Sequence, residues 1–246
     1  MQIRLSLYKV LFASLLFLSE PHRVNASEDA CSAELTISAP DDWPPYSWKS
    51  EDGEYHGIDI DFLTAAFSTL NYCWSYNTYP SSSRAFREFQ KGNVDVIFAA
   101  SFSDERASWS IYSVPYRFED MRVVYFKGDK TLDWLSSSSI AINRGGFYGE
   151  VFEQFRKQCS TCIYESNTAY ERLNMVQNKR VKYAIEDYAT IQYLKKEFTF
   201  DNIEASDENI HSNDIFLMLR PGALTPSQLQ DLNTVLENNS KKLNMR

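Results

Sequence analysis

The segment VDVIFAASFSDERASWSIYSVPY (Val94–Tyr116) decides the interpretation of this chain, because it joins an expected core strand to an unusual polar loop. Its first part, VDVIFAA (Val94–Ala100), is apolar enough for a buried strand. The loop that follows contains one arginine, Arg106, next to Glu105. Arg106 therefore either forms a surface ion pair with Glu105 or binds an anion that is not part of the protein.

Residues 1–26 have the features of a secretory signal peptide. A basic start precedes the apolar run VLFASLLFL (Val10–Leu18), and VNA, ending at Ala26, is a small-x-small cleavage site. The apolar run is too short for a comfortable membrane span, although an uncleaved anchor is the alternative interpretation. We expect cleavage after Ala26 and a soluble, periplasmic protein.

The charge of the chain excludes classes of partner that need a basic surface. Its formal net charge is −8, and removal of Arg4, Lys9, Arg23 and Glu20 with the signal peptide changes this to −10. Nucleic acids and anionic membranes bind basic patches, so neither is an expected partner. The mature chain of 246 − 26 = 220 residues suits one large domain or two lobes.

The four cysteines are expected to form disulfides, as an even number does in exported proteins. Cys31 and Cys73 stand at the starts of two strands expected to be parallel neighbours, so one bridge should join them. Cys159 and Cys162 form CSTC, which we interpret as a local structural disulfide. A redox-active pair or half of a zinc site is the alternative, but no second cysteine pair or nearby histidine completes a metal site.

Short apolar runs alternate with helical patterns along the mature chain, which predicts α/β lobes with mainly parallel sheets flanked by helices. The C-terminal helix should begin after Thr225, with Pro226 at its first position and Gln228 completing a capping box. The expected strands are Glu34–Ser38, Cys73–Asn77, Val94–Ala100, Met121–Phe126, Ser139–Asn143, Cys162–Ser166, Val181–Asp187 and Ile215–Leu219.

This pattern predicts two lobes with a ligand cleft between them. Residues 27–120, joined by the returning residues 215–246, form lobe 1, and residues 121–214 form lobe 2. The links are SVPYRFED (Ser113–Asp120) and ASDENIHSND (Ala205–Asp214), which would make a two-stranded hinge.

Four loops at the carboxyl ends of strands are the candidate binding loops, because ligands of open α/β sheets bind there. These loops supply an arginine with hydroxyls, paired glycines before a helix, an acidic pair and aromatic walls. Together, these groups suit a zwitterion with a carboxylate on one side and an ammonium on the other. The candidate residues are Ser101, Ser103 and Arg106, Gly145 and Gly146, Glu186 and Asp187, and Trp43, Tyr46 and Trp48.

The motifs in these loops resemble those of extracellular solute-binding proteins of family 3, the amino-acid-binding components of ABC importers. The resemblance rests on DDWPPYSW, GIDIDFLTAAF and the segment GNVDVIFAASFSDERASWSIYSVPY, and it extends through AINRGG and KYAIEDYATIQYL. It implies the two-lobed type 2 periplasmic binding protein fold.

The resemblance also implies roles for seven residues. Arg106 matches the arginine that clamps the ligand carboxylate, and Asp187 matches the acid that holds the α-ammonium. Ser101 matches a hydroxyl position that contacts the ligand. Backbone N–H groups at Gly146 and Phe147 would assist the carboxylate, and Trp43 and Tyr46 would form aromatic walls. The chain departs from the family pattern at Ala100, Ser103 and Gly146.

We therefore expect a monomeric solute-binding protein, not an enzyme, that captures an amino-acid-like solute for import through an ABC permease. No cofactor or metal is expected. The alternatives are an enzyme on the same fold, like a cyclohexadienyl dehydratase using Glu186 as an acid, and a ligand sensor for a membrane receptor.

Overall fold

The structure is a computed structural model that describes residues 30–129, 133–136 and 139–242, and the predicted signal peptide lies outside this part of the chain. The described residues from Cys31 onward belong to one compact unit. Within them, no helix has both the length and the apolar character needed to cross a bilayer.

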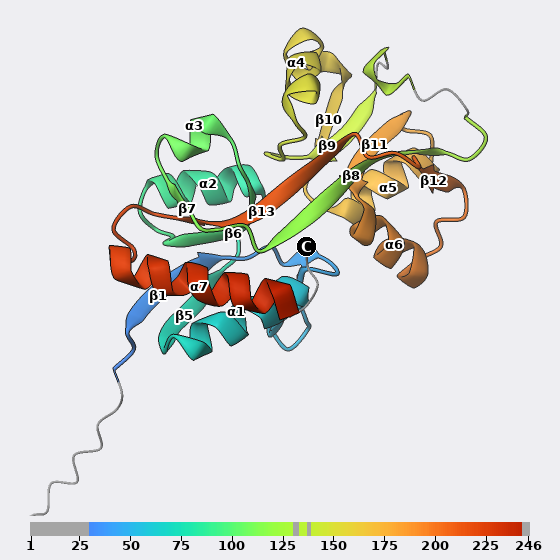
Figure 1. The fold of residues 1–246 in the computed structure, drawn as a ribbon. Coiled ribbons are helices and arrows are strands. Elements are labelled where there is room, and N and C mark those ends of the chain that lie inside the picture. Colours follow the sequence, from blue (N-terminus) through green and yellow to red (C-terminus); the bar gives the residue numbers. More distant parts are fainter. Residues whose placement is uncertain (1–29, 130–132, 137–138, 243–246) are drawn as a thin grey trace, which may run out of the picture. The chain divides into compact units, whose positions relative to one another are not determined.

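One hydrogen-bonded series of strands runs through this unit in the order β10-β9-β11-β8-β13-β6-β1-β5 (Figure 1), with β12 paired to β8 and β7 to β13. The strands β5, β1 and β6 are parallel to one another, as are β10, β9 and β11. Their bounds are β1 Ala33–Ser38, β5 Tyr72–Asn77, β6 Val96–Ser101, β7 Ile111–Tyr112, β8 Arg117–Phe126, β9 Ile140–Asn143, β10 Ile163–Ser166, β11 Tyr183–Asp187, β12 Ile203–Ala205 and β13 His211–Leu219.

The two long strands β8 and β13 connect the parallel groups, because they pair antiparallel with each other and lie side by side in Figure 1. Strand β13 also pairs antiparallel with β6, and β8 pairs antiparallel with β11. Both strands are longer than predicted. Residues 117–120 and 211–214, which the sequence analysis assigned to the links between lobes, pair with each other and extend β8 and β13. The lobe boundaries at 120/121 and 214/215 remain a prediction.

Helices cover both faces of each parallel group. Leu63 of α1 and Leu236 of α7 share one buried cluster with Ile37 of β1, while Phe89 of α2 packs on the opposite face with Ile97. The helices are α1 Ile58–Thr69, α2 Ser82–Gln90, α3 Asp104–Ala107, α4 Glu150–Gln158, α5 Ala169–Gln177, α6 Tyr188–Glu197 and α7 Pro226–Lys242, with 3-10 turns η1 Trp134–Ser136 and η2 Ser160–Cys162.

The proline-rich segment after β1 contains a small sheet where the sequence suggested only a loop. Strands β2 (Asp42–Trp43), β3 (Ser47–Lys49) and β4 (Tyr55–His56) pair antiparallel. Its carbonyls cap α1, because the N–H groups of Ile58 and Asp59 donate to Pro45 O and Tyr46 O at 3.0 Å each. Gly57, with φ 125°, allows this approach, since a Cβ there would lie 2.2 Å from Tyr46 O.

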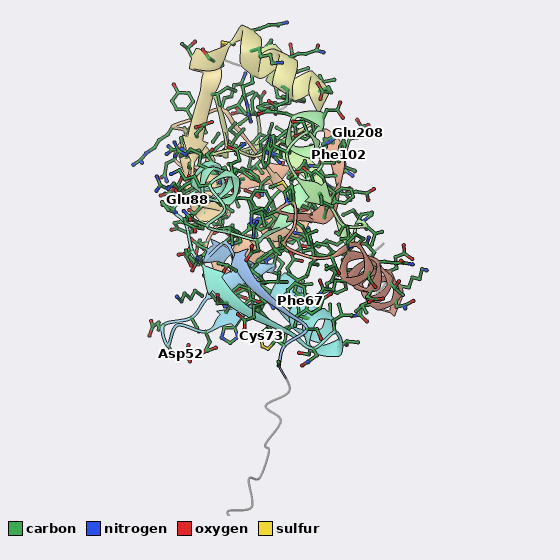
Figure 2. The ribbon with its side chains drawn as sticks, turned by 90° about the vertical axis from the view of Figure 1, so that its left-hand side faces the viewer. Asp52, Phe67, Cys73, Glu88, Phe102 and Glu208 are labelled. Carbon is green, nitrogen blue, oxygen red and sulfur yellow. A yellow bond between two sulfur atoms is a disulfide. The ribbon has the colours of Figure 1, made fainter. Side chains whose placement is uncertain are left out.

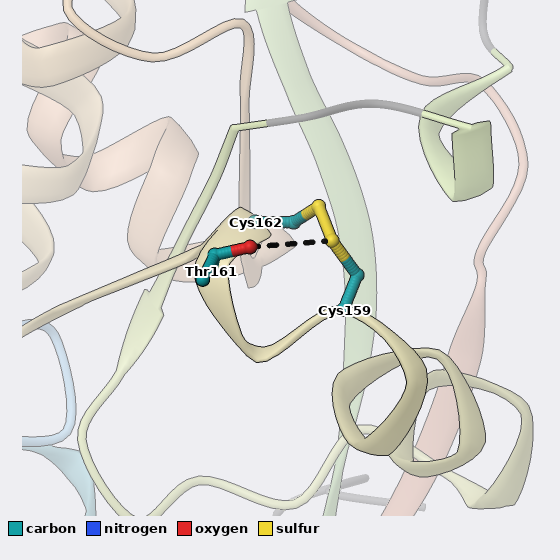
Figure 3. Close-up of a disulfide and its surroundings, with 3 residues drawn as sticks. All are labelled: Cys159, Thr161 and Cys162. Carbon is teal, nitrogen blue, oxygen red and sulfur yellow. Dashed lines mark hydrogen bonds between the residues drawn. A yellow bond between two sulfur atoms is a disulfide. The ribbon is translucent and has the colours of Figure 1, made fainter.

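The structure joins both cysteine pairs as disulfides. Cys31 is bonded to Cys73, with Cα atoms 5.6 Å apart (Figure 2, where Cys73 is labelled). Cys159 is bonded to Cys162, and Cys159 Sγ lies 3.8 Å from Thr161 Oγ1 (Figure 3). The second bridge closes the turn after α4, as the structural interpretation of CSTC predicts.

Removal of the Cys31–Cys73 bridge should destabilise the protein far more than removal of the local bridge. The first bridge spans 42 residues and the second spans 3. In the chain-entropy account, closing these loops stabilises the folded protein by about 4 kcal/mol for the first bridge and about 1.5 kcal/mol for the second. Urea unfolding of the paired serine variants, Cys31→Ser/Cys73→Ser and Cys159→Ser/Cys162→Ser, measures both values. Equal destabilisation by the two variants would contradict this prediction.

Candidate functional site

Two adjoining cavities lie at the carboxyl ends of the parallel strands. The larger has a volume of about 310 Å³ and the smaller about 70 Å³. They are neighbours because they share six lining residues, which are Trp43, Ser82, Phe86, Ala99, Asn143 and Arg172. Five of the seven predicted ligand-binding residues line the smaller cavity, and these are Trp43, Ser101, Arg106, Gly146 and Phe147.

Arg106 lies on the short helix α3 and is half-buried rather than exposed. It donates from Nη1 to Ser101 O (3.2 Å) and from Nη2 to Gly145 O (3.0 Å), and its guanidinium lies 4.2 Å from the ring centre of Phe86. Burial lowers the pKa of Arg106, yet an arginine stays cationic at neutral pH. The two bonds use two of its five N–H donors, so the fork keeps donors for an anion.

Ser101 and Ser103, which precede Arg106 in the chain, have different roles. Ser103 is the N-cap of α3, because its Oγ accepts the backbone N–H of Arg106 at 3.3 Å. The hydroxyl of Ser103 is therefore used inside the protein, whereas Ser101 lines the smaller cavity.

The glycine loop after β9 packs against Arg106 and the start of α2. A Cβ on Gly145, which has φ 86°, would lie 2.7 Å from Ser83 Oγ. A Cβ on Gly146 would lie 2.7 Å from Tyr148 Oη. The backbone N–H of Gly146 already donates to Asn143 O at 3.0 Å. The glycines thus permit close packing, and the N–H of Gly146 is engaged in the turn.

Asp187 and Tyr46 line neither cavity and bind each other instead. Tyr46 donates its hydroxyl to Asp187 Oδ2 at 2.8 Å. The same carboxylate accepts the N–H of Thr190 (3.1 Å), which makes it the N-cap of α6, and the N–H of Asp120 (3.2 Å). Burial raises the pKa of Tyr46, so its hydroxyl keeps its proton. Asp187 therefore holds three segments together in the structure.

A buried ion pair that the sequence analysis did not identify lies behind the site. Arg117, at the start of β8, donates from Nε to Asp59 Oδ1 (2.7 Å) and from Nη2 to Oδ2 (2.9 Å). The exposed fractions are 2% for Arg117 and 0% for Asp59. Tyr116 donates to the same carboxylate at 3.0 Å, and Tyr46 stacks over the guanidinium at 3.7 Å. Although burial alone would lower the pKa of Arg117, Asp59 and Glu119 raise it.

Glu119 lines the smaller cavity and is only 3% exposed. Its Oε1 forms an ion pair with Arg117 Nη1 at a distance of 2.8 Å. Burial raises the pKa of Glu119 to about 8, against the opposing effect of Arg117.

A second buried pair forms another wall. Arg172 of α5 donates from Nε and Nη2 to Glu186 Oε2, at 2.7 and 2.5 Å. Arg172 lines both cavities, and Glu186 lines the smaller one. Burial raises the pKa of Glu186. The arginine of this pair lies in an ordinary helical pattern, so nothing in the sequence distinguishes it from a surface residue.

Comparisons with known proteins find similar sequences and similar folds. The sequence model for bacterial extracellular solute-binding proteins, family 3, matches residues 35–241. The L-cystine-binding protein TcyJ of Escherichia coli strain K12 is 22% identical over 194 residues, which are 76% of this chain and 71% of TcyJ.

Solved structures share the fold. A histidine kinase sensor domain with similarity to periplasmic binding proteins superposes with a TM-score of 0.75 and 17% identity, covering 88% of this chain and 94% of that one. An ABC uptake transporter substrate-binding protein from Streptococcus pneumoniae, with bound histidine, superposes with a TM-score of 0.72 and 20% sequence identity. The match covers 85% of this chain and 87% of that one. At these identities, the likeness concerns the fold, which is that of two-lobed type 2 periplasmic binding proteins.

The Asp59–Arg117 ion pair should contribute much more to the free energy of unfolding than an exposed ion pair does. Asp59→Ala leaves a buried guanidinium without its main partner, which typically costs about 3–5 kcal/mol of unfolding free energy. The matched control is Glu165→Ala, because Glu165 pairs with Arg144 at 3.4 Å while the side chains are 41% and 47% exposed. An exposed pair is worth about 1 kcal/mol or less. Urea unfolding measures both, and similar losses would contradict this account.

Proposed function

This chain belongs to the bacterial extracellular solute-binding proteins of family 3, and on this premise we propose that its solute is an amino acid or a similar zwitterion. The observation that carries the proposal is the position of Arg106, which lines the smaller cavity and has N–H donors that its two bonds to backbone oxygens do not use. A planar fork with free donors matches a carboxylate, which it can bind through two parallel bonds.

The carboxylate of the solute would lie between Arg106, the hydroxyl of Ser101 and the backbone at Phe147. All three residues line the smaller cavity. In such a site, the solute completes the hydrogen bonding of a guanidinium that is already held in place by Ser101 O and Gly145 O. A guanidinium held before binding loses less conformational freedom when the solute arrives, which favours affinity.

The side chain of the solute would extend into the larger cavity. This cavity adjoins the smaller one through their shared wall, and its volume of about 310 Å³ leaves room for more than an amino-acid backbone. Trp43 and Phe86 provide aromatic walls, while Asp41 and Asp42 add acidic groups. Burial and Asp41 raise the pKa of Asp42.

Import is the biological role that fits best. TcyJ is named for binding L-cystine, and the protein from Streptococcus pneumoniae is described as the binding component of an ABC uptake transporter. By analogy, this chain would act in the periplasm after cleavage at Ala26, as a monomer that delivers its solute to an ABC permease. A two-stranded hinge at β8 and β13 would let its lobes close on the solute.

An enzymatic role has less support from the site. Glu186, the acid that a dehydratase-like enzyme would use, is bonded to Arg172 and also accepts the N–H of Asp187 at 3.2 Å. Incubation with prephenate or arogenate tests this alternative directly, since any product formed would support the enzyme.

A thermal-shift screen with the protein L-amino acids and L-cystine should identify the solute. A ligand present at one hundred times its dissociation constant stabilises a protein by about 2.7 kcal/mol, which gives a readable shift. If no compound in the panel raises the melting temperature, the solute is not an amino acid of this set and the proposal is contradicted.

Arg106→Ala should weaken binding of that amino acid by about 30-fold to several thousand-fold, because removal of one member of a desolvated charge pair costs roughly 2–5 kcal/mol. Arg106→Lys should recover only part of the affinity, since an ammonium cannot form the two parallel bonds. Titration calorimetry measures both variants.

The matched control is Arg144→Ala, which removes an exposed arginine next to Gly145 and should leave affinity within about twofold of the wild type, as expected for a surface substitution. Wild-type affinity in Arg106→Ala would instead limit Arg106 to its bonds with Ser101 O and Gly145 O.

A further inference from the structure

We infer that the solute has two charged heads and that the larger cavity receives the second one, which carries both an ammonium and a carboxylate. The solute would then be a diamino dicarboxylic acid, in which a short chain joins two α-amino-acid ends. This inference rests on the proposed function, which places the first head at Arg106, and extends it by naming the class of solute.

The first argument is that unused backbone donors lie at the wall of the larger cavity. Two helices begin there, because Ser81 and Ser82 at the start of α2 and Thr168 at the start of α5 line it. Ser81 and Thr168 each cap one N–H group further along the first turn. The N–H groups of the first helical residues, Ser82 and Ala169, have no acceptor among the residues that the structure describes. Two helix starts with free N–H groups favour a carboxylate.

The second argument is that two buried side chains add donors to the same cavity. Ser38 lines it and is only 5% exposed, yet its hydroxyl forms no hydrogen bond within the described part of the chain. Buried hydroxyls usually have a partner, which a solute can provide here. Arg172 uses Nε and Nη2 for Glu186, whereas its Nη1 has only a long contact of 3.5 Å with Ser166 Oγ.

The third argument is that two acids in the same cavity lack a cation. Asp41 and Asp42 both line it, and neither carboxylate has an ion-pair partner among the described residues, although both side chains are exposed. Burial, Asp41 and Glu171 raise the pKa of Asp42, while Arg172 lowers it, so the acids lie close to each other and to the guanidinium. An ammonium next to Asp41 and Asp42 would relieve their repulsion.

Only a head with both signs of charge suits all of these groups. A purely cationic side chain would leave the donors at the two helix starts unused, and a purely acidic one would leave Asp41 and Asp42 without a cation. The cavity volume of about 310 Å³ suits a second head. The chain between the heads would pass Trp43 and Phe86, which line both cavities.

Titration calorimetry with two series of matched compounds tests this inference. In the first series, the double-headed compound is diaminopimelate. Lysine lacks its distal carboxylate, α-aminopimelate lacks its distal ammonium, and norleucine lacks both. The second series has the longer spacer of L-cystine, and the mixed disulfides of cysteine with cysteamine, β-mercaptopropionate and methanethiol lack the same groups in the same order.

In at least one series, the double-headed compound should bind at least about tenfold more tightly than either compound that lacks one distal charge. A tenfold difference corresponds to about 1.4 kcal/mol, close to the smallest contribution typical of a hydrogen bond to a charged group. The compound that lacks both distal charges should bind most weakly.

Two exposed acids can be neutralised to test the ammonium contact. The double variant Asp41→Asn/Asp42→Asn should lower the affinity for the double-headed compound to about that of the compound without the distal ammonium. The affinity for that second compound should stay within about twofold of its wild-type value. The matched control is Glu197→Gln/Asp201→Asn, which removes two exposed acids that line neither cavity and should behave as the wild type.

The carboxylate contact can be tested at Ser82, the first residue of α2. Proline is tolerated at this position because its N–H has no intrahelical acceptor, so Ser82→Pro removes this donor while the helix remains. Ser82→Ala removes the hydroxyl alone. The proline variant should bind the double-headed compound about fivefold or more weakly than the alanine variant, with equal affinities for the compound without the distal carboxylate. Melting temperatures check that both variants are folded.

Two outcomes would overturn the inference. If the double-headed compound lacks the tenfold preference in both series while single-headed amino acids bind, the larger cavity does not receive a second head and the proposed function remains intact. If none of these compounds and no amino acid of the thermal-shift panel binds, the proposed function is overturned together with the inference.

Discussion

The buried pair of Asp59 and Arg117 is the interaction on which the rest of the site depends. Asp59 lies in the first turn of α1, and Arg117 begins β8, the long strand that pairs with β11 and β13. Tyr46 stacks over the same guanidinium and bonds to Asp187 at the end of β11. One arginine therefore fixes the positions of a helix start, a long connecting strand and the aromatic loop.

Burying this pair has a physical cost that the geometry offsets. A guanidinium removed from water needs well-directed partners, and Arg117 has two hydrogen bonds to one carboxylate and an aromatic ring over its face. Arg117 also forms an ion pair with Glu119 at 2.8 Å. A second carboxylate therefore supports the buried guanidinium from the wall of the smaller cavity.

The sequence predicted the fold well because the fold depends on local patterns. Alternating apolar runs and helical spacing located the main strands, and Thr225 and Gln228 form the predicted capping box at α7. Arg106 could be selected because it follows a core strand closely. The small sheet β2-β3-β4 could not be predicted, since its strands are two or three residues long and are determined by packing.

The charged residues behind the site were harder to identify for a related reason. Glu119 and Arg117 occupy alternate positions of a strand and resemble solvated surface residues in sequence, and only the pairing of β8 shows that both are buried. Asp187 was recognised as an acid at a strand end, but its bonds to Tyr46 and Asp120 come from segments distant in the chain. Which acid faces a cavity is a tertiary property.

A crystal structure of the protein with its bound amino acid would test the central claim most directly. The account predicts that both carboxylate oxygens of the solute lie within about 2.7–3.2 Å of the Arg106 guanidinium nitrogens. A solute whose carboxylate contacts no nitrogen of the Arg106 guanidinium would contradict it.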